Sequence, residues 1–154
     1  MTVATHHGQF TLERTYRATP ERVYAAWSEV GAKAHWFIGP EGWRELRREM
    51  DFRVGGHELL EGRYGSERVT RYTARFHALE AARRIVFVYD MHLSDVHHST
   101  SLATVELAAT ANGTRLRFTE QVAFLDGTTS ADSRAHGTGA HLDRLALYLA
   151  RDTF

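Results

Sequence analysis

Four side chains in the sequence are candidates for acid or base chemistry, namely Asp90, Glu106, Glu120 and His141. Glu120 stands apart because it shares the register of an alternating apolar run, formed by Leu116, Phe118, Val122 and Phe124. A carboxylate on that face would be buried, and it would need a hydrogen-bonding partner or a raised pKa. Because perturbed groups gather at functional sites, Glu120 is the candidate catalytic acid or base. A structural, hydrogen-bonded glutamate is the alternative interpretation, and we favour it.

Ten histidines raise the question of a metal site, but their spacing does not support one. His97 and His98 are adjacent, and adjacent residues of a strand or a loop usually point apart. His136 and His141 lie five residues apart, which is about 140° around a helix rather than one face. The chain has no cysteine, no HExxH or GxSxG motif, and no glycine-rich phosphate or dinucleotide loop. We therefore expect no metal site and no cofactor.

The length of the chain predicts a single domain over residues 1–154. The 19 Lys and Arg residues balance 19 Asp and Glu residues, whereas proteins that bind nucleic acids or anionic membranes usually carry an excess of basic residues. No apolar run approaches the length of a membrane span, and no signal-peptide pattern opens the chain. We therefore expect a cytoplasmic protein with no nucleic-acid and no membrane partner. We expect residues 1–8 to form a flexible terminus.

Residues 129–151 predict one long amphipathic helix. Small or apolar side chains recur every three or four residues, at Ala131, Ala135, Thr138, Leu142, Leu145 and Leu149. Thr129 or Ser130 can cap the start of this helix. Arg134 and Arg144 fall largely off the apolar stripe. We therefore expect the leucines to be buried against a sheet and Arg144 to contribute little to stability.

Two glycines, Gly137 and Gly139, interrupt this helix. Each costs about 0.5–1 kcal/mol relative to alanine in a helix interior, so their presence asks for a reason. One interpretation, which we favour, is close packing of the helix backbone on the sheet. The other is that the missing side chains leave room for a ligand between helix and sheet.

The segments before this helix read mainly as strands. Alternating apolar residues predict strands over residues 10–16, 50–54, 57–64, 69–78, 85–91, 102–109 and 116–124. Asn112 and Gly113 give the last two a hairpin turn. Short helices are predicted from Pro20 and over residues 34–37, and residues 94–99 are predicted to form a loop. This order predicts an α+β fold in which a long helix covers an antiparallel sheet.

Six segments together resemble a known family: ERTYRATPERVYAAW, HWFIGP, DFRVGG, RRIVFVYDM, NGTRLRFTEQVAF and HGTGAHLDRLALYL. Their order is similar to that of SRPBCC proteins of the START-like superfamily, above all the branch related to the activator of heat-shock protein 90 ATPase. The resemblance implies a helix-grip fold, in which a curved antiparallel sheet of about six or seven strands wraps around the long C-terminal helix, with two short helices after the first strand. It also implies a cavity between sheet and helix. Thr138 departs from the family pattern, which usually has a tryptophan after the glycine at Gly137.

This resemblance does not imply one reaction, so three hypotheses stay open. They are a protein that binds a small apolar or amphipathic molecule, a cyclase- or hydrolase-like enzyme that uses Glu120, and a co-chaperone. We favour binding, because aromatic and methionine side chains share the inward register. Homodimer formation also stays open. The residues expected to contact a ligand are Trp36, Phe37, Tyr72, Phe87, Tyr89, Met91, Phe118, Glu120, Phe124, Thr138, His141, Leu142 and Leu145.

Overall fold

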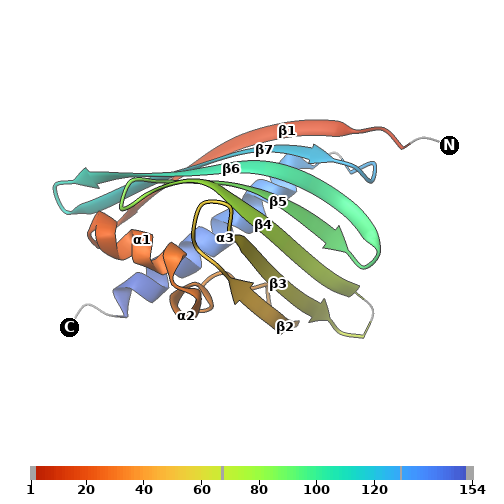
Figure 1. The fold of residues 1–154 in the computed structure, drawn as a ribbon, viewed down its shortest axis with the longest axis horizontal. Coiled ribbons are helices and arrows are strands. Elements are labelled where there is room, and N and C mark those ends of the chain that lie inside the picture. Colours follow the sequence, from red (N-terminus) through yellow and green to blue (C-terminus); the bar gives the residue numbers. More distant parts are fainter. Residues whose placement is uncertain (1–2, 67, 129, 152–154) are drawn as a thin grey trace.

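The computed structural model describes residues 3–66, 68–128 and 130–151. They form one seven-stranded antiparallel sheet and three helices, an α+β helix-grip fold (Figure 1). The elements in chain order are β1 (His6–Tyr16), α1 (Pro20–Ser28), α2 (Val30–Lys33), β2 (Trp43–Met50), β3 (His57–Tyr64), β4 (Arg68–Glu80), β5 (Arg84–Leu93), β6 (Val96–Thr110), β7 (Gly113–Phe124) and α3 (Ala131–Ala150). None of the described helices is both long and apolar enough to cross a bilayer.

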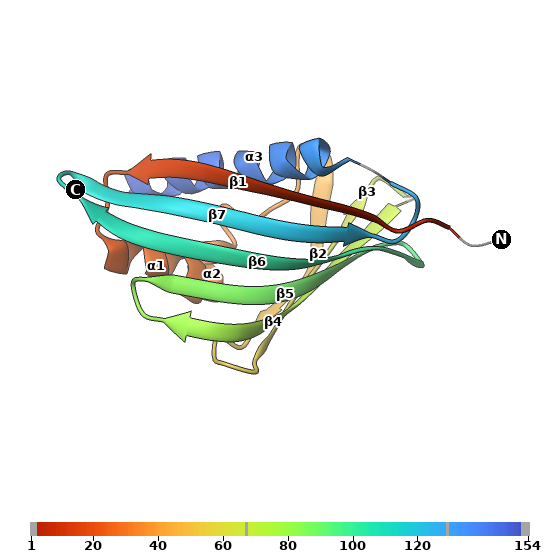
Figure 2. The same cartoon turned by 90° about the horizontal axis from the view of Figure 1, so that it is seen from above.

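The order of strands in the sheet is β1-β7-β6-β5-β4-β3-β2. Strands β2 to β7 form a meander, whereas β1 pairs with β7, the last strand of the chain. The short helices α1 and α2 carry the chain from β1 to β2 at the opposite edge. The sheet curves strongly, and α3 lies across its concave face (Figures 1 and 2). Helix α3 packs mainly against β1 and also touches α1.

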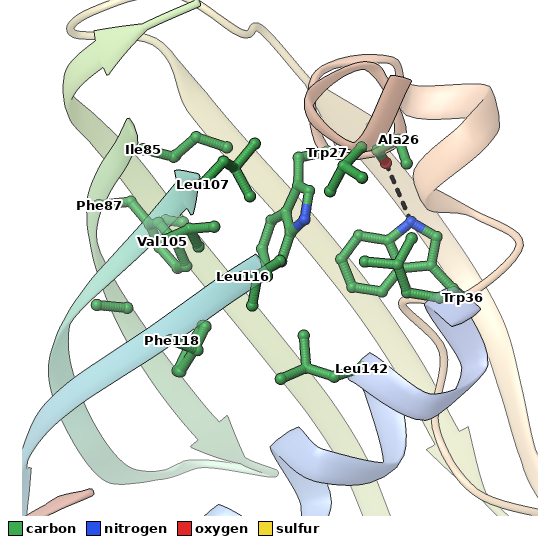
Figure 3. Packing of buried hydrophobic residues seen from close by; sticks show 14 of the residues in the cluster. Ala26, Trp27, Trp36, Ile85, Phe87, Val105, Leu107, Leu116, Phe118 and Leu142 are labelled. Carbon is green, nitrogen blue, oxygen red and sulfur yellow. Dashed lines mark hydrogen bonds between the residues drawn. The ribbon is translucent and has the colours of Figure 1, made fainter. Parts of the chain in front are cut away.

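The core fills the space between α1, α3 and the middle of the sheet (Figure 3). Trp27 and Trp36 meet edge to face, with ring centroids 4.7 Å apart. The indole Nε1 of Trp36 donates to the carbonyl oxygen of Ala26 at 3.0 Å, which satisfies a polar group that is otherwise buried. The strands contribute alternate residues, including Phe87, Val105 and Leu116. This apolar cluster closes one end of the concave face.

The leucine stripe of α3 is confirmed. Leu142 and Leu145 have no exposed surface, and Leu149 is 3% exposed. The Ser130 side chain caps the helix by accepting a hydrogen bond from the backbone N–H of Ser133 at 3.0 Å, while Thr129 lies outside the described residues. The Tyr16 hydroxyl donates to the carbonyl oxygen of Leu142 at 3.0 Å, which ties the middle of α3 to the end of β1.

Four local expectations differ from the structure. Strand β1 begins at His6 and pairs there with Phe124, so residues 6–8 belong to the sheet rather than to a flexible terminus. Helix α2 covers residues 30–33, and residues 34–37 form turns beyond it. Strand β2 ends at Met50, and residues 51–54 turn towards β3. Strand β6 begins at Val96, inside the expected loop.

The reasons for these differences are physical. Strand β2 is an edge strand whose central residues are mostly exposed, so it lacks the alternation that burial of one face produces. The start of β6 is polar, but backbone pairing with β5 continues through it to the Leu93–Val96 pair. Main-chain hydrogen bonds extend these strands where side chains give no signal.

Candidate ligand-binding cavity

A cavity of about 530 Å³ lies between α3 and the concave face of the sheet. Eleven of the expected ligand contacts line it, namely Trp36, Phe37, Tyr72, Phe87, Tyr89, Met91, Phe118, Phe124, Thr138, His141 and Leu142. Glu120 and Leu145 do not reach its wall. A more open hollow of about 700 Å³ lies over the outer face of the sheet, where Gln9, Leu102 and Gln121 are exposed. The less open cavity between α3 and the sheet is therefore the candidate site.

Aromatic rings form much of the cavity wall. Phe37, from the segment after α2, meets Tyr72 of β4 at 4.9 Å between ring centroids. Tyr72 in turn lies 4.9 Å from Tyr89 of β5, and Tyr89 lies 6.0 Å from Phe87. The inward register of two neighbouring strands thus joins with the α2–β2 connection to build one apolar surface.

Arg134 holds a polar cluster where α3 begins. Its Nη1 donates to the Tyr89 hydroxyl at 2.9 Å and to the Oε2 atom of Glu120 at 3.1 Å. Its Nη2 donates to the Oγ of Ser99 at 2.7 Å. Tyr89 and Ser101 also donate to the same Glu120 oxygen, at 2.8 and 2.7 Å. Burial and the neighbouring Glu120 raise the pKa of Tyr89, so the tyrosine stays protonated and serves as a donor.

Glu120 therefore has the role of a buried structural partner in this cluster. Its side chain has no exposed surface and does not line the cavity, although the sequence places it among the expected ligand contacts. Its second oxygen, Oε1, is buried and has no hydrogen-bond partner among the described residues. A carboxylate behind the wall can fix Arg134 and Tyr89, but a bound molecule meets those two side chains first.

Arg134 is one of the cavity residues that sequence reasoning missed. It was placed off the apolar stripe, yet it precedes Thr138 by four residues and Leu142 by eight, which is the spacing of one helix face. The side chain is 13% exposed, and its guanidinium lies 5.7 Å from the Tyr89 ring centroid and 5.4 Å from that of Phe124. The signal was present in the buried register of Glu120, because a buried carboxylate needs a cationic or hydrogen-bonding partner.

A second buried ion pair, Lys33 with Glu58, stands beside the cavity at its α2 end. The Lys33 Nζ lies 2.7 Å from the Oε1 of Glu58, and the two side chains are 3% and 2% exposed. Lys33 lines the cavity and sits 4.8 Å from the Phe37 ring centroid. Burial lowers the pKa of Lys33, and Glu58 opposes that change. This pair was not anticipated, because its partners come from α2 and β3.

Arg144 lies against the segment that follows α2. Its Nε donates to the carbonyl oxygen of Trp36 at 3.2 Å, and its Nη2 donates to that of Ile38 at 2.6 Å and to the Nδ1 of His141 at 2.8 Å. Burial and the Arg144 charge lower the pKa of His141 to about 3, so the ring is neutral and accepts this bond. Arg144 thus joins α3 to residues 36–38, an interaction that its place off the apolar stripe did not predict.

His98 lines the cavity near the start of α3, and its Nδ1 lies 2.7 Å from the Oδ2 of Asp126. Burial acts to raise the pKa of Asp126, but hydrogen bonds from His98 and Thr128 outweigh it and bring the value to about 2. No group of three or more His, Cys, Asp or Glu side chains is placed to hold a metal ion within the described ranges. The ionised Asp126 thus orients the His98 ring.

Each of the two interpretations of the glycines in α3 holds for one of them. A Cβ on Gly139 would lie 3.1 Å from the Nη2 of Arg14, so this glycine lets the helix pack closely on β1. A Cβ on Gly137 would have no neighbour within 4 Å, and Gly137 lines the cavity. One glycine therefore serves packing, and the other leaves space beside the cavity wall.

Known proteins share this fold over nearly the whole chain. A family model described as "Activator of Hsp90 ATPase homolog 1-like protein" matches residues 17–150. A putative uncharacterized protein from Rhizobium leguminosarum has a solved structure with 36% identity and a TM-score of 0.91, covering 97% of this chain and 98% of that chain. A protein from Rhizobium loti is 39% identical with a TM-score of 0.87, covering 94% and 99%. An AHSA1-like protein from Aeromonas hydrophila, at 21% identity and a TM-score of 0.74, shares the fold over 94% and 93%. No curated protein is significantly similar.

Proposed function

Because the chain belongs to the activator of Hsp90 ATPase homolog 1-like family, and its fold forms a cavity here, we propose that it binds a small apolar or amphipathic molecule between α3 and the sheet. The observation that carries this proposal is the cavity itself. Its volume falls within the range of about 300–1,000 Å³ that is typical of small-molecule sites. Its wall joins aromatic rings with a few fixed polar groups, the usual composition of such sites.

The polar groups of this wall are already oriented before any ligand arrives. Arg134 is held by Glu120 and Ser99, and His141 is held by Arg144. Side chains fixed in this way lose little further conformational freedom when a ligand binds, so more of the contact energy appears as affinity. This arrangement supports a binding site formed in advance rather than one assembled by the ligand.

The other two hypotheses gain no specific support. Catalysis by Glu120 would require its carboxylate to reach a substrate, and that carboxylate lies behind Tyr89 and Arg134 with no exposed surface. The co-chaperone hypothesis rests on the family name alone. We therefore propose binding as the function.

The test of this proposal narrows the opening of the cavity from Gly137, which lines the cavity at an exposed position. Residues three and four positions away, Ser133, Arg134, Ala140 and His141, all line the cavity, so a side chain at Gly137 lies over the same stretch of wall. The probe is N-phenyl-1-naphthylamine, a neutral apolar dye whose fluorescence rises away from water. We expect saturable binding to the wild type and at least about tenfold weaker binding to Gly137→Leu.

The matched control is Gly137→Ala, which removes the same glycine but adds only a methyl group in open space. We expect this variant to bind the dye as the wild type does. Absence of dye binding to the wild type, or equal affinity of Gly137→Leu and Gly137→Ala, would overturn the proposal. Far-ultraviolet circular dichroism establishes that each variant is folded.

A further inference from the structure

The ionised side chains on the cavity wall all carry the same sign. Three cations, Lys33, Arg134 and Arg144, line the cavity, whereas no Asp or Glu within the described ranges does so. The carboxylates of Glu58 and Glu120 lie behind the wall, each paired with one of these cations. A molecule in the cavity therefore meets hydrogen-bond donors and positive charge.

Two of the three cations are already neutralised. Lys33 pairs with Glu58 at 2.7 Å, and Arg134 pairs with Glu120 at 3.1 Å. A second anion at either pair would leave a net negative charge in surroundings from which water is largely removed. These two pairs are therefore poor sites for an acidic group.

Arg144 differs because its three acceptors are all uncharged. They are the carbonyl oxygens of Trp36 and Ile38 and the ring of His141. The neighbouring Asp143 is 69% exposed, and its carboxylate pairs with Arg14 of β1 at 2.8 Å. The Nη1 of Arg144 has no hydrogen-bond partner among the described residues. Tyr64 also lines the cavity, and the charge of Arg144 opposes the rise in the Tyr64 pKa that burial causes. A fixed guanidinium with free donors and no paired carboxylate favours an anion.

We propose that the ligand is an amphipathic anion, with an apolar body among the aromatic rings and one acidic group, such as a carboxylate or sulfonate, on Arg144. This inference rests on the proposed function and names the chemical class of its ligand. Hydrogen bonds between an arginine and an anion are stronger than those between neutral groups, so the acidic group adds affinity and orients the molecule.

The experiment compares two dyes that share one ring system. They are 8-anilinonaphthalene-1-sulfonate, which is permanently anionic, and N-phenyl-1-naphthylamine, which lacks the sulfonate. Because Arg144 also holds residues 36–38 of the wall, we expect Arg144→Gln to weaken binding of both dyes, and to weaken binding of the sulfonate at least about tenfold more than binding of the neutral dye. Arg144→Lys keeps the charge and should retain most of the sulfonate affinity. Arg117→Gln is the control, because Arg117 pairs with Glu13 at an exposed position.

A measurement on the wild type does not depend on the folding of any variant. In it, 1-naphthaleneacetate and its amide compete with the neutral dye, and we expect the acid to displace the dye at about tenfold lower concentration. Equal potency of acid and amide, or an equal loss of both dyes in Arg144→Gln, would overturn the anion proposal while leaving the cavity proposal standing. Failure of both dyes to bind the wild type would overturn the cavity proposal itself.

Discussion

The two flanks of α3 are built in opposite ways. On one flank Gly139 and Leu145 are buried and do not line the cavity, and the helix approaches β1 so closely that a Cβ on Gly139 would lie 3.1 Å from Arg14. On the other flank Arg134 and Arg144 reach across to β6 and to residues 36–38 through hydrogen bonds. The first flank excludes space by apolar packing, and the second spans it with long polar side chains.

This difference explains how a single helix can hold a domain together and still leave a cavity. Apolar packing is non-directional and fills the available volume, so it closes the gap between α3 and β1. A hydrogen-bonded arginine holds its two ends at a fixed distance, so the arginines fix the helix relative to the sheet without filling the space beside them. The cavity is thus stable because apolar packing holds one flank of α3 against β1, while hydrogen-bonded arginines hold the other flank to β6 and to residues 36–38.

The largest expected effect comes from Arg134→Met on the cavity flank. This variant removes the cation beside Glu120, whose carboxylate has no exposed surface, and an uncompensated buried charge costs about 3–5 kcal/mol of unfolding free energy. Urea titration measures the loss. Arg117→Met is the control, since its exposed pair with Glu13 should be worth only about 0–1 kcal/mol.

Glu120→Gln combined with Arg134→Met should recover part of that loss, because the double variant removes both charges. No recovery would mean that the destabilisation comes from lost packing of the arginine rather than from an orphaned carboxylate. The cavity flank would then depend on shape, as the packed flank does.

Leu145→Ala is the corresponding change on the packed flank. Leu145 has no exposed surface and does not line the cavity, so the cost should be about 2–5 kcal/mol without a change in dye affinity. Leu147→Ala is the matched control, because Leu147 lies on the same helix and is 69% exposed. Similar urea midpoints for the two variants would remove the distinction between packed and solvent-facing positions.

Sequence reasoning predicted the packed flank better than the cavity flank, and the reason is the range of the interactions. Burial of Leu142 and Leu145 follows from spacing along one helix, which is a local pattern. The role of Arg134 depends on Glu120 of β7, and the role of Arg144 depends on carbonyl groups of Trp36 and Ile38. Partners that meet only through the fold leave no mark in local periodicity.

The same reasoning separates the strands. The buried strand β5 was predicted within two residues at each end, because its apolar alternation is strong. Strand β2 (Trp43–Met50) was misplaced to residues 50–54, because it lies at the sheet edge and most of its residues are exposed. The aromatic residues of the cavity, by contrast, were anticipated from register, since Tyr72, Phe87 and Tyr89 alternate on strands that face inward.

The pH dependence of the unfolding free energy tests the cavity flank of α3 through His141, which accepts a hydrogen bond from Arg144. The pKa of His141 is about 3 in the folded protein, well below the value of about 6.5 of an unperturbed histidine. Between these values the unfolded chain binds a proton that the folded protein does not bind. Unfolding free energy should therefore fall as the pH falls through this window, by up to about 1.4 kcal/mol per pH unit.

His141→Asn isolates that contribution, because asparagine does not titrate and its side-chain oxygen can accept the hydrogen bond from Arg144. We expect the free energy of unfolding of this variant to fall less steeply than that of the wild type between about pH 6 and pH 4. Parallel curves from urea titrations at each pH would mean that His141 is protonated as readily in the folded protein as in the unfolded chain.

The smallest expected effect distinguishes the two glycines directly. Gly137→Ala adds a methyl group in open space and removes a helix-destabilising residue, so stability should rise by about 0.5–1 kcal/mol. Gly139→Ala has the same propensity gain, but its Cβ would press on Arg14, whose guanidinium also donates to Asp143. We expect the gain to be largely cancelled there, because the arginine must shift. Thermal or urea denaturation of the two variants measures the difference, and an equal gain at both positions would show that α3 has room on its β1 side as well as beside the cavity.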